Sequence, residues 1–284
     1  MSNHLKGLLI AFFGVLILTP EGILVKLANS DSFTILFWRG LFLTLSILII
    51  LLISYRSNAL NQIKGIGKEG LLIGCLTGFG GTTFILAIHY TTLAKTLVII
   101  SASPLMVALV SFILLGERPR LFTWLAMLIV FSGIYIVMSG DTSGLNLKGS
   151  LFALASVTSG GFSFTLLRKY KEVNMVPAMA INGLFITFVG LFFADSLSLS
   201  SQAMTYIVIS SVLVAISFSL ITIAPRYIPA PEVAIFFPMG TVIGTVLAWL
   251  ILKEELSSTA VFGGIVVILT LFIHSIYSAR QSNN

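Results

Sequence analysis

The sequence predicts an all-α integral membrane protein with ten transmembrane helices, arranged as two inverted five-helix repeats with both termini in the cytoplasm. Composition, the lengths of the apolar runs and an internal repeat lead to this fold class. Of the 284 residues, 57% are hydrophobic and only 9% are charged, and the mean hydropathy is +1.07. Soluble domains carry about 25% charged residues, so this chain has too little polar surface to face water on all sides.

The apolar runs have the length that a bilayer requires. About 20 apolar residues at 1.5 Å per residue cross the roughly 30 Å hydrocarbon core. Lys6 and the first run resemble a signal peptide, but no small-residue cleavage site follows, so we interpret this run as the first transmembrane helix. The ten predicted spans cover residues 7–27, 33–54, 69–89, 92–115, 121–138, 149–168, 174–194, 203–224, 232–252 and 258–277.

The basic residues indicate the orientation. With the N-terminus inside, the termini and the even-numbered connections hold eleven of them: Lys6, Arg56, Lys64, Lys68, Arg118, Arg120, Arg168, Lys169, Lys171, Arg226 and Arg280. The outer connections and helix ends hold four: Lys26, Lys95, Lys148 and Lys253. Because cytoplasmic loops carry the excess of Lys and Arg, both termini are predicted inside.

Several function classes are disfavoured or excluded. The net charge of +6 is spread over short gaps between apolar runs, which does not fit a nucleic-acid-binding stripe. The one cysteine, Cys75, lies in an apolar run, so neither an intramolecular disulfide nor a cysteine metal cluster is expected. The sequence has no HExxH and no GxxxxGK[ST] motif. We therefore expect no enzyme, no cofactor and no ATP-driven pump, and a gradient as the driving force.

An internal repeat relates the two halves of the chain. HYTTLAKTLVIISASPLMVALVSFILLGE (89–117) aligns without gaps with RYIPAPEVAIFFPMGTVIGTVLAWLILKE (226–254), at an offset of 137 residues, from Tyr90 to Tyr227. Five spans in each half is an odd number, so the second half enters the membrane upside down. Inverted repeats are typical of secondary transporters. We predict the first repeat over residues 1–140 and the second over residues 147–284.

Several stretches resemble one known family. TLVIISASPLMVALVSFILLGERPRLFTWLAMLIVFSGIYIVMSG (96–140), FWRG (37–40), TPEG (19–22) and APEVAIF (230–236) are similar to the EamA type of the drug/metabolite transporter superfamily, in order along the chain. The resemblance implies a central cavity lined mainly by the first, third, fourth, sixth, eighth and ninth transmembrane helices. Many members carry Glu-Pro in the ninth helix, where this chain has Gly240-Thr241.

The first span contains a proline beside a carboxylate. Pro20 breaks a helix interior, and such breaks are tolerated in membranes where they line a water-filled space. Glu21 is costly in an apolar run unless it faces a cavity or a charged partner. We predict that Glu21 binds a substrate amine or a proton at this helix break. A structural ion pair with Arg39 is the alternative.

Arg39 lies at a similar depth in the second span. It could hold a substrate carboxylate or neutralise Glu21 permanently, and we favour the structural role slightly because FWR recurs among relatives with different substrates. Its neighbour Trp38 is a candidate substrate-stacking residue, although an interface aromatic is the more common role.

Three further side chains lie near predicted span ends. Lys95 and its repeat counterpart Glu232 would mark the two edges of the pathway, or else Lys95 snorkels and Glu232 caps a helix. Tyr90 is a candidate site residue whose ordinary role is in an aromatic belt. The lone His89 is weak evidence of proton coupling.

Small residues gather in the third, sixth and ninth spans. Gly70, Gly74 and Gly78 are spaced by four, which indicates close helix packing. In the sixth span, TSGGFSF (158–164) could pack in the same way and direct Ser159 and Ser163 towards a cavity. Ser163 is therefore a candidate substrate-binding residue.

Together these features predict a secondary transporter, an exporter of small metabolites in a bacterial inner membrane, that works by alternating access. Glu21 with Arg39 or Lys95 in a Phe-rich cavity suits amino acids or related zwitterions. An organic cation or drug is the alternative substrate, and a passive channel or a non-transporting receptor or scaffold is the alternative class. The expected partners are the substrate and the lipid bilayer, with no nucleic acid and with proton coupling left open. A monomer would suffice, and a dimer stays open.

Overall fold

The computed structural model describes residues 3–116, 121–139, 144–228, 233, 236–254 and 258–282. Every regular element within these ranges is an α-helix or a short 3-10 helix, in agreement with the all-α fold class. Glu232, Arg118 and Arg120 lie outside the described residues, so the structure gives no account of them.

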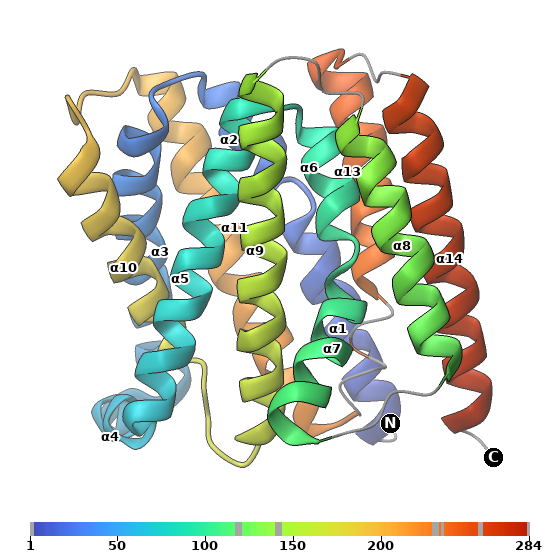
Figure 1. Cartoon of the computed structure of the whole chain (residues 1–284). Coiled ribbons are helices and arrows are strands. Elements are labelled where there is room, and N and C mark those ends of the chain that lie inside the picture. The colour runs from blue at the N-terminus through green and yellow to red at the C-terminus, as the bar shows by residue number, and fades with distance from the viewer. Residues whose placement is uncertain are drawn as a thin grey trace.

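The first half of the chain forms helices that run back and forth along a bundle (Figure 1). The predicted first span is divided into α1 (Asn3–Leu18) and α2 (Glu21–Ala28). The other elements are α3 (Ser32–Tyr55), η1 (Arg56–Asn58), α4 (Ala59–Gly65), α5 (Gly67–Tyr90), α6 (Leu93–Ile100), α7 (Ser103–Leu115) and α8 (Leu121–Ser139). The predicted fourth span is therefore also divided, into α6 and α7, a break that the sequence analysis did not predict.

The second half continues the bundle with long helices. Its elements are α9 (Gly144–Lys169), α10 (Ala178–Phe193), α11 (Ser201–Ile223), η2 (Ala224–Arg226), α13 (Phe236–Leu252) and α14 (Ser258–Ser282). The start of α1 and the end of α14 lie at the same end of the bundle (Figure 1).

The helices have the length and surface of a membrane protein. Among the described residues, six helical stretches are long and apolar enough to cross a membrane, with α1 and α2 counted together and α6 and α7 counted together. Four shorter apolar helices accompany them. Large apolar side chains such as Leu52, Ile53 and Phe192 are exposed on the bundle. Apolar surface of this kind is covered by lipid rather than by water. The protein is therefore a multi-pass membrane protein.

Helices from the two halves pair throughout the bundle. On one side α3 packs against α10, and on the opposite side α8 packs against α14 (Figure 1). In the middle, α5 packs against α9, α1 against α11, and α6 against α13. A site at the centre of the bundle therefore draws its residues from both halves.

Glycines bring α5 close to α10. A Cβ atom at Gly74 would lie 2.6 Å from the carbonyl oxygen of Ala178, and one at Gly78 would lie 2.8 Å from Cβ of Phe185. Such distances leave no room for a side chain, so the packing interpretation is confirmed for these two glycines. Gly70 packs instead against Ile66, which directly precedes α5.

Candidate substrate site

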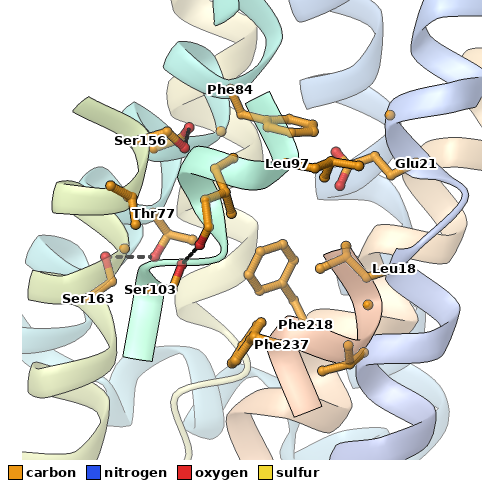
Figure 2. A pocket seen from close by; sticks show the side chains of 18 of the residues that line it. Leu18, Glu21, Thr77, Phe84, Leu97, Ser103, Ser156, Ser163, Phe218 and Phe237 are labelled. Carbon is orange, nitrogen blue, oxygen red and sulfur yellow. Dashed lines mark hydrogen bonds between the residues drawn. The ribbon is translucent and has the colours of Figure 1, made fainter. Parts of the chain in front are cut away.

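A cavity of about 190 Å³ lies at the centre of the bundle between the two halves. It is mostly apolar, and its lining includes the aromatic rings of Phe84, Phe164, Phe218 and Phe237. Figure 2 shows Phe218 and Phe237 at one end of this space and Glu21, Leu97 and Phe84 towards the other. The lining comes from α1, α2, α3, α5, α6, α7, α9, α10, α11 and α13, together with Thr19 between α1 and α2. These elements include the six predicted spans that the family resemblance implies.

The division between α1 and α2 borders this cavity. Pro20 has no N–H to donate to the carbonyl oxygen of Leu16, and the backbone N–H of Thr19 donates to it instead, at 3.2 Å. The Thr19 hydroxyl donates to the carbonyl oxygen of Val15 at 3.1 Å. The carbonyl oxygens of Val15 and Leu16 therefore keep partners at the break, and Glu21 lies in the first turn of α2, on the cavity wall.

A second broken helix faces the same space. Pro104 cannot donate to the carbonyl oxygen of Ile100, which accepts the hydroxyl of Ser103 instead. α6 ends at Ile100 and α7 begins at Ser103, and Ser103 lines the cavity (Figure 2). Two short helices, α2 and α6, thus line the cavity, and the helix break beside each of them borders it.

Glu21 and Arg39 are paired within the protein. Nη2 of Arg39 donates to Oε1 of Glu21, and both residues are buried, with exposed fractions of 2% and 6%. Both also line the cavity. Nη1 and Nε of Arg39 have no hydrogen-bond partner in the described part of the chain. The guanidinium therefore carries donors beyond those that its ion pair uses.

Asn182 on α10 is a site residue that the sequence analysis missed. It is 2% exposed, it lines the cavity, and its Oδ1 atom has no hydrogen-bond partner among the described residues. A Cβ atom at Gly81 would lie 3.5 Å from Nη1 of Arg39 and 3.8 Å from Oδ1 of Asn182, so these two atoms border the same small volume beside Gly81. The available signal was an amide in the middle of the apolar run 174–194.

Hydroxyl groups supply the remaining polar lining. Ser163 on α9 lines the cavity, and its hydroxyl lies 3.4 Å from that of Thr77 on α5 (Figure 2). Ser156 also lines the cavity, with its hydroxyl donating to the carbonyl oxygen of Gly80 at 2.9 Å. Ser159 donates to the carbonyl oxygen of Leu76 at 2.6 Å and lies outside the lining.

Trp38, Tyr90 and Lys95 lie outside the described lining of the cavity. Nε1 of Trp38 donates to the carbonyl oxygen of Leu197 at 2.8 Å, at the connection between α10 and α11. The Tyr90 ring stacks on Phe152 with the Lys148 ammonium 4.1 Å from its centre. Lys95 is buried on α6. The structure thus brings Glu21, Arg39 and Ser163 to one cavity. Trp38, Tyr90 and Lys95 lie away from it.

The lining of the cavity carries a few polar groups on an otherwise apolar wall. In the described ranges, no group of three His, Cys, Asp or Glu residues could hold a metal ion. Two opposite charges, an amide and several hydroxyls surround an apolar space, an arrangement typical of small-ligand sites.

Comparison with known proteins identifies the family. The EamA-like transporter family matches residues 5–139 and again residues 147–276. The chain belongs to the EamA-like transporter family. This EamA-like transporter is accordingly a membrane transporter of the drug/metabolite type, as its sequence motifs had indicated.

One named relative agrees with that assignment, and one solved structure shares the fold of this EamA-like transporter. A protein named "Uncharacterized transporter" from Methanothermobacter thermautotrophicus is 25% identical over 237 residues, covering 76% of this chain and 69% of the relative. A solved chain described as "Crystal structure of protein" has a TM-score of 0.69 and 14% identity, covering 97% of this chain and 98% of that one. At this identity the second comparison shows a shared fold.

Proposed function

We propose that this EamA-like transporter is a secondary carrier that exports small zwitterionic metabolites, amino acids or related molecules, by alternating access. The observation that carries the proposal is the polar set on the wall of an otherwise apolar cavity. Glu21, Arg39 and Asn182 all line this space, and the last two have hydrogen-bonding atoms without partners in the described chain.

The charges suit a ligand with both an ammonium and a carboxylate group. Nη1 of Arg39 is a donor without a partner in the described chain, and a substrate carboxylate would accept a strong, charge-assisted hydrogen bond from it. The Glu21 carboxylate can accept further hydrogen bonds beside its pair with Arg39, and Oδ1 of Asn182 is another acceptor. The Phe side chains would cover an apolar substrate side chain.

The size of the cavity favours a small metabolite over a drug. Pockets for drug-sized ligands begin at about 300 Å³. The cavity here measures about 190 Å³. We therefore prefer an amino acid or a similar zwitterion as the substrate.

The proposed carrier has ten transmembrane helices in two inverted repeats, residues 1–140 and 147–284. Two family matches along one chain support this division. The start of α1 and the end of α14 lie at one end of the bundle, as an even number of crossings requires. The basic residues then favour a cytoplasmic location for both termini, in a bacterial inner membrane.

The alternative substrate is an organic cation. It is favoured by one observation, that Arg39 donates to Glu21 and so can serve to hold the carboxylate in place. In that case Arg39 would stabilise the protein, and only Glu21 would contact the substrate. The two substrates differ in whether a neutral residue at position 39 removes binding.

Counterflow in proteoliposomes tests the proposal. Protein is reconstituted with a mixed pool of amino acids, amines and nucleosides, and exchanged species are identified by mass spectrometry. We expect exchange of amino acids or related zwitterions, lost in Glu21→Gln and retained in Glu69→Gln, whose carboxylate is exposed on α5. Normal exchange by folded Glu21→Gln protein would reject Glu21 as a substrate residue. Repeating the assay with and without a pH gradient tests coupling to protons.

A further inference from the structure

We propose that Glu254 is a positioning residue that closes one end of the central cavity by holding the N-terminus of α6. This inference rests on the proposed alternating-access function, because closure at one end is a step of that cycle. The end concerned is the one where α2 ends, α6 begins and α13 ends, and we refer to it as the α6 end of the cavity. In the proposed orientation it faces outside.

The Glu254 carboxylate binds the first turn of α6 through both oxygens. Oε1 accepts the backbone N–H of Leu93 at 3.0 Å, and Oε2 accepts that of Ala94 at 3.1 Å. The first N–H groups of a helix have no partner within the helix, and its dipole favours negative charge there. Thr92 supplies an ordinary cap as well, since its hydroxyl accepts the N–H of Lys95 at 3.2 Å. α6 therefore already has an N-cap in Thr92, and Glu254 adds hydrogen bonds that connect α6 to the end of α13. We refer to this connection as the Glu254 tie.

Lys26 extends this tie to a third helix. Its Nζ atom donates to the carbonyl oxygen of Thr91 at 3.1 Å and lies 3.8 Å from Oε1 of Glu254. Lys26 is in the last turn of α2, whereas Glu254 lies two residues beyond the end of α13. The first two elements, α2 and α6, fall within the first family match, and Glu254 falls within the second. The contact thus joins the two halves whose relative movement opens a carrier of this kind.

The residues held by Glu254 also form the cavity wall. Leu93 donates its N–H to Glu254, and its side chain lines the cavity against Gly22, where an added Cβ atom would lie 2.5 Å from Leu93 Cδ1. One turn later Leu97 lines the cavity against Gly244 on α13, with a corresponding distance of 2.8 Å. While Glu254 holds α6, both leucines stay packed against α2 and α13. Release of α6 would withdraw them from these glycines.

The break after Ile100 lets α6 move as a unit. α6 has eight residues and is separated from α7 by Ser101 and Ala102, so a change at these two residues can tilt α6 without unfolding α7. Hinges in carriers and enzymes are commonly a few residues at the ends of elements. The Glu254 side chain is 11% exposed and that of Lys26 is 28% exposed, so water can replace their contacts when the tie opens.

A cysteine-labelling experiment tests the closure without any substrate. Gly160 lines the cavity, and a Cβ atom there would meet no other atom within 4 Å, so Gly160→Cys introduces a thiol into open space. Cys75 is replaced by Ala to leave one thiol. A membrane-impermeant maleimide is then applied in turn from each side of vesicles containing this parent protein.

We expect Glu254→Gln to label at least threefold faster than the parent from the α6 end. Glu254→Asp should lie between the two, because it keeps the charge on a shorter side chain. Asp195→Asn is the matched control, since Asp195 is an exposed carboxylate in the connection from α10 to α11, at the same end of the bundle. An unchanged rate in folded Glu254→Gln protein would overturn the proposal.

A second variant covers a failure of Glu254→Gln to fold. Lys26→Gln removes the ammonium and leaves both hydrogen bonds from α6 to Glu254, so a smaller increase in labelling from the same side is expected. No increase in Lys26→Gln would then overturn the proposal. Faster labelling without zwitterion counterflow would support the closure and reject the proposed substrate. Zwitterion counterflow with an unchanged labelling rate would support the proposed substrate and reject the closure by Glu254.

Discussion

Arg39 donates to Glu21 through Nη2 alone, and its Nη1 and Nε atoms have no hydrogen-bond partner in the part of the chain that is described. A buried donor left unsatisfied costs about 1–3 kcal/mol, and more when the group is charged. A guanidinium that served only to neutralise Glu21 would be better satisfied by further acceptors around it. A ligand or water in the cavity would supply them, because Arg39 lines that space. The ion pair and the substrate site can thus be one structure.

Replacement of Arg39 by Leu separates the two substrate classes. A zwitterion carrier should lose at least about tenfold in apparent affinity, which corresponds to about 1.4 kcal/mol for the lost carboxylate contact. A cation carrier should keep its affinity and lose only stability. Counterflow with an amino acid and with its decarboxylated amine measures this difference. Arg39→Lys is the companion variant, because it keeps the charge but not the paired donors. Loss of amine transport alone would contradict the zwitterion proposal.

Replacement of Glu21 by Gln should abolish exchange and lower stability. The change leaves Arg39 charged and without its carboxylate partner, and breaking a buried pair in this way costs about 3–5 kcal/mol. The double variant Glu21→Gln, Arg39→Gln removes both charges and should recover part of the thermal midpoint. It should not recover exchange. Recovery of both would show that the pair is structural, and fluorescence-detected size exclusion after heating provides the stability measurement.

Replacement of Asn182 by Ala should weaken substrate binding with little effect on folding. Its Oδ1 atom has no partner among the described residues, so no hydrogen bond to that atom is lost when the amide is removed. If Oδ1 accepts from the substrate, the loss of about 1–2 kcal/mol raises the apparent KM roughly 5- to 30-fold. The maximal rate should change less. Asn182→Asp adds a competing carboxylate on the same cavity wall as Arg39 and should impair zwitterion binding more strongly. Unchanged KM in both variants would remove Asn182 from the site.

Sequence reasoning located the charged residues Glu21 and Arg39 within membrane spans, but it did not show which way each neighbouring side chain points. Composition and run length predict membrane helices, because lipid demands a fixed length of apolar chain. They also give the depth of Glu21 and Arg39, and both residues line the cavity. Trp38 is adjacent to Arg39 in the chain and yet bonds to Leu197 away from the cavity, because the rotation of α3 is set by its packing against α10 and α11. That rotation depends on contacts between distant segments, which local periodicity does not encode.

The division between α6 and α7 was missed for a related reason. Pro104 lies in the first turn of α7, a position that proline commonly takes in a helix. The other residues of SASP (101–104) are small and do not interrupt the apolar run around them, so the sequence does not mark the end of α6. Asn182 was missed because the apolar run around it has the length of a membrane span, which one central amide does not change. Both residues are visible in the sequence as exceptions to an apolar pattern, as Pro20 and Glu21 are.

Packing of α5 against α10 gives a prediction about stability. Gly74→Ala would place a methyl group 2.6 Å from the carbonyl oxygen of Ala178 and from Cβ of Ile181, so the helices must separate. Overpacking of this kind costs about 1–3 kcal/mol and should lower the thermal midpoint in detergent by several degrees. Gly160→Ala is the matched control, because an added Cβ atom there has no neighbour within 4 Å. Since alanine also favours helix over glycine, Gly160→Ala should leave the midpoint unchanged or raise it. Equal midpoints for the two variants would show that the approach of α5 to α10 at Gly74 does not contribute to stability.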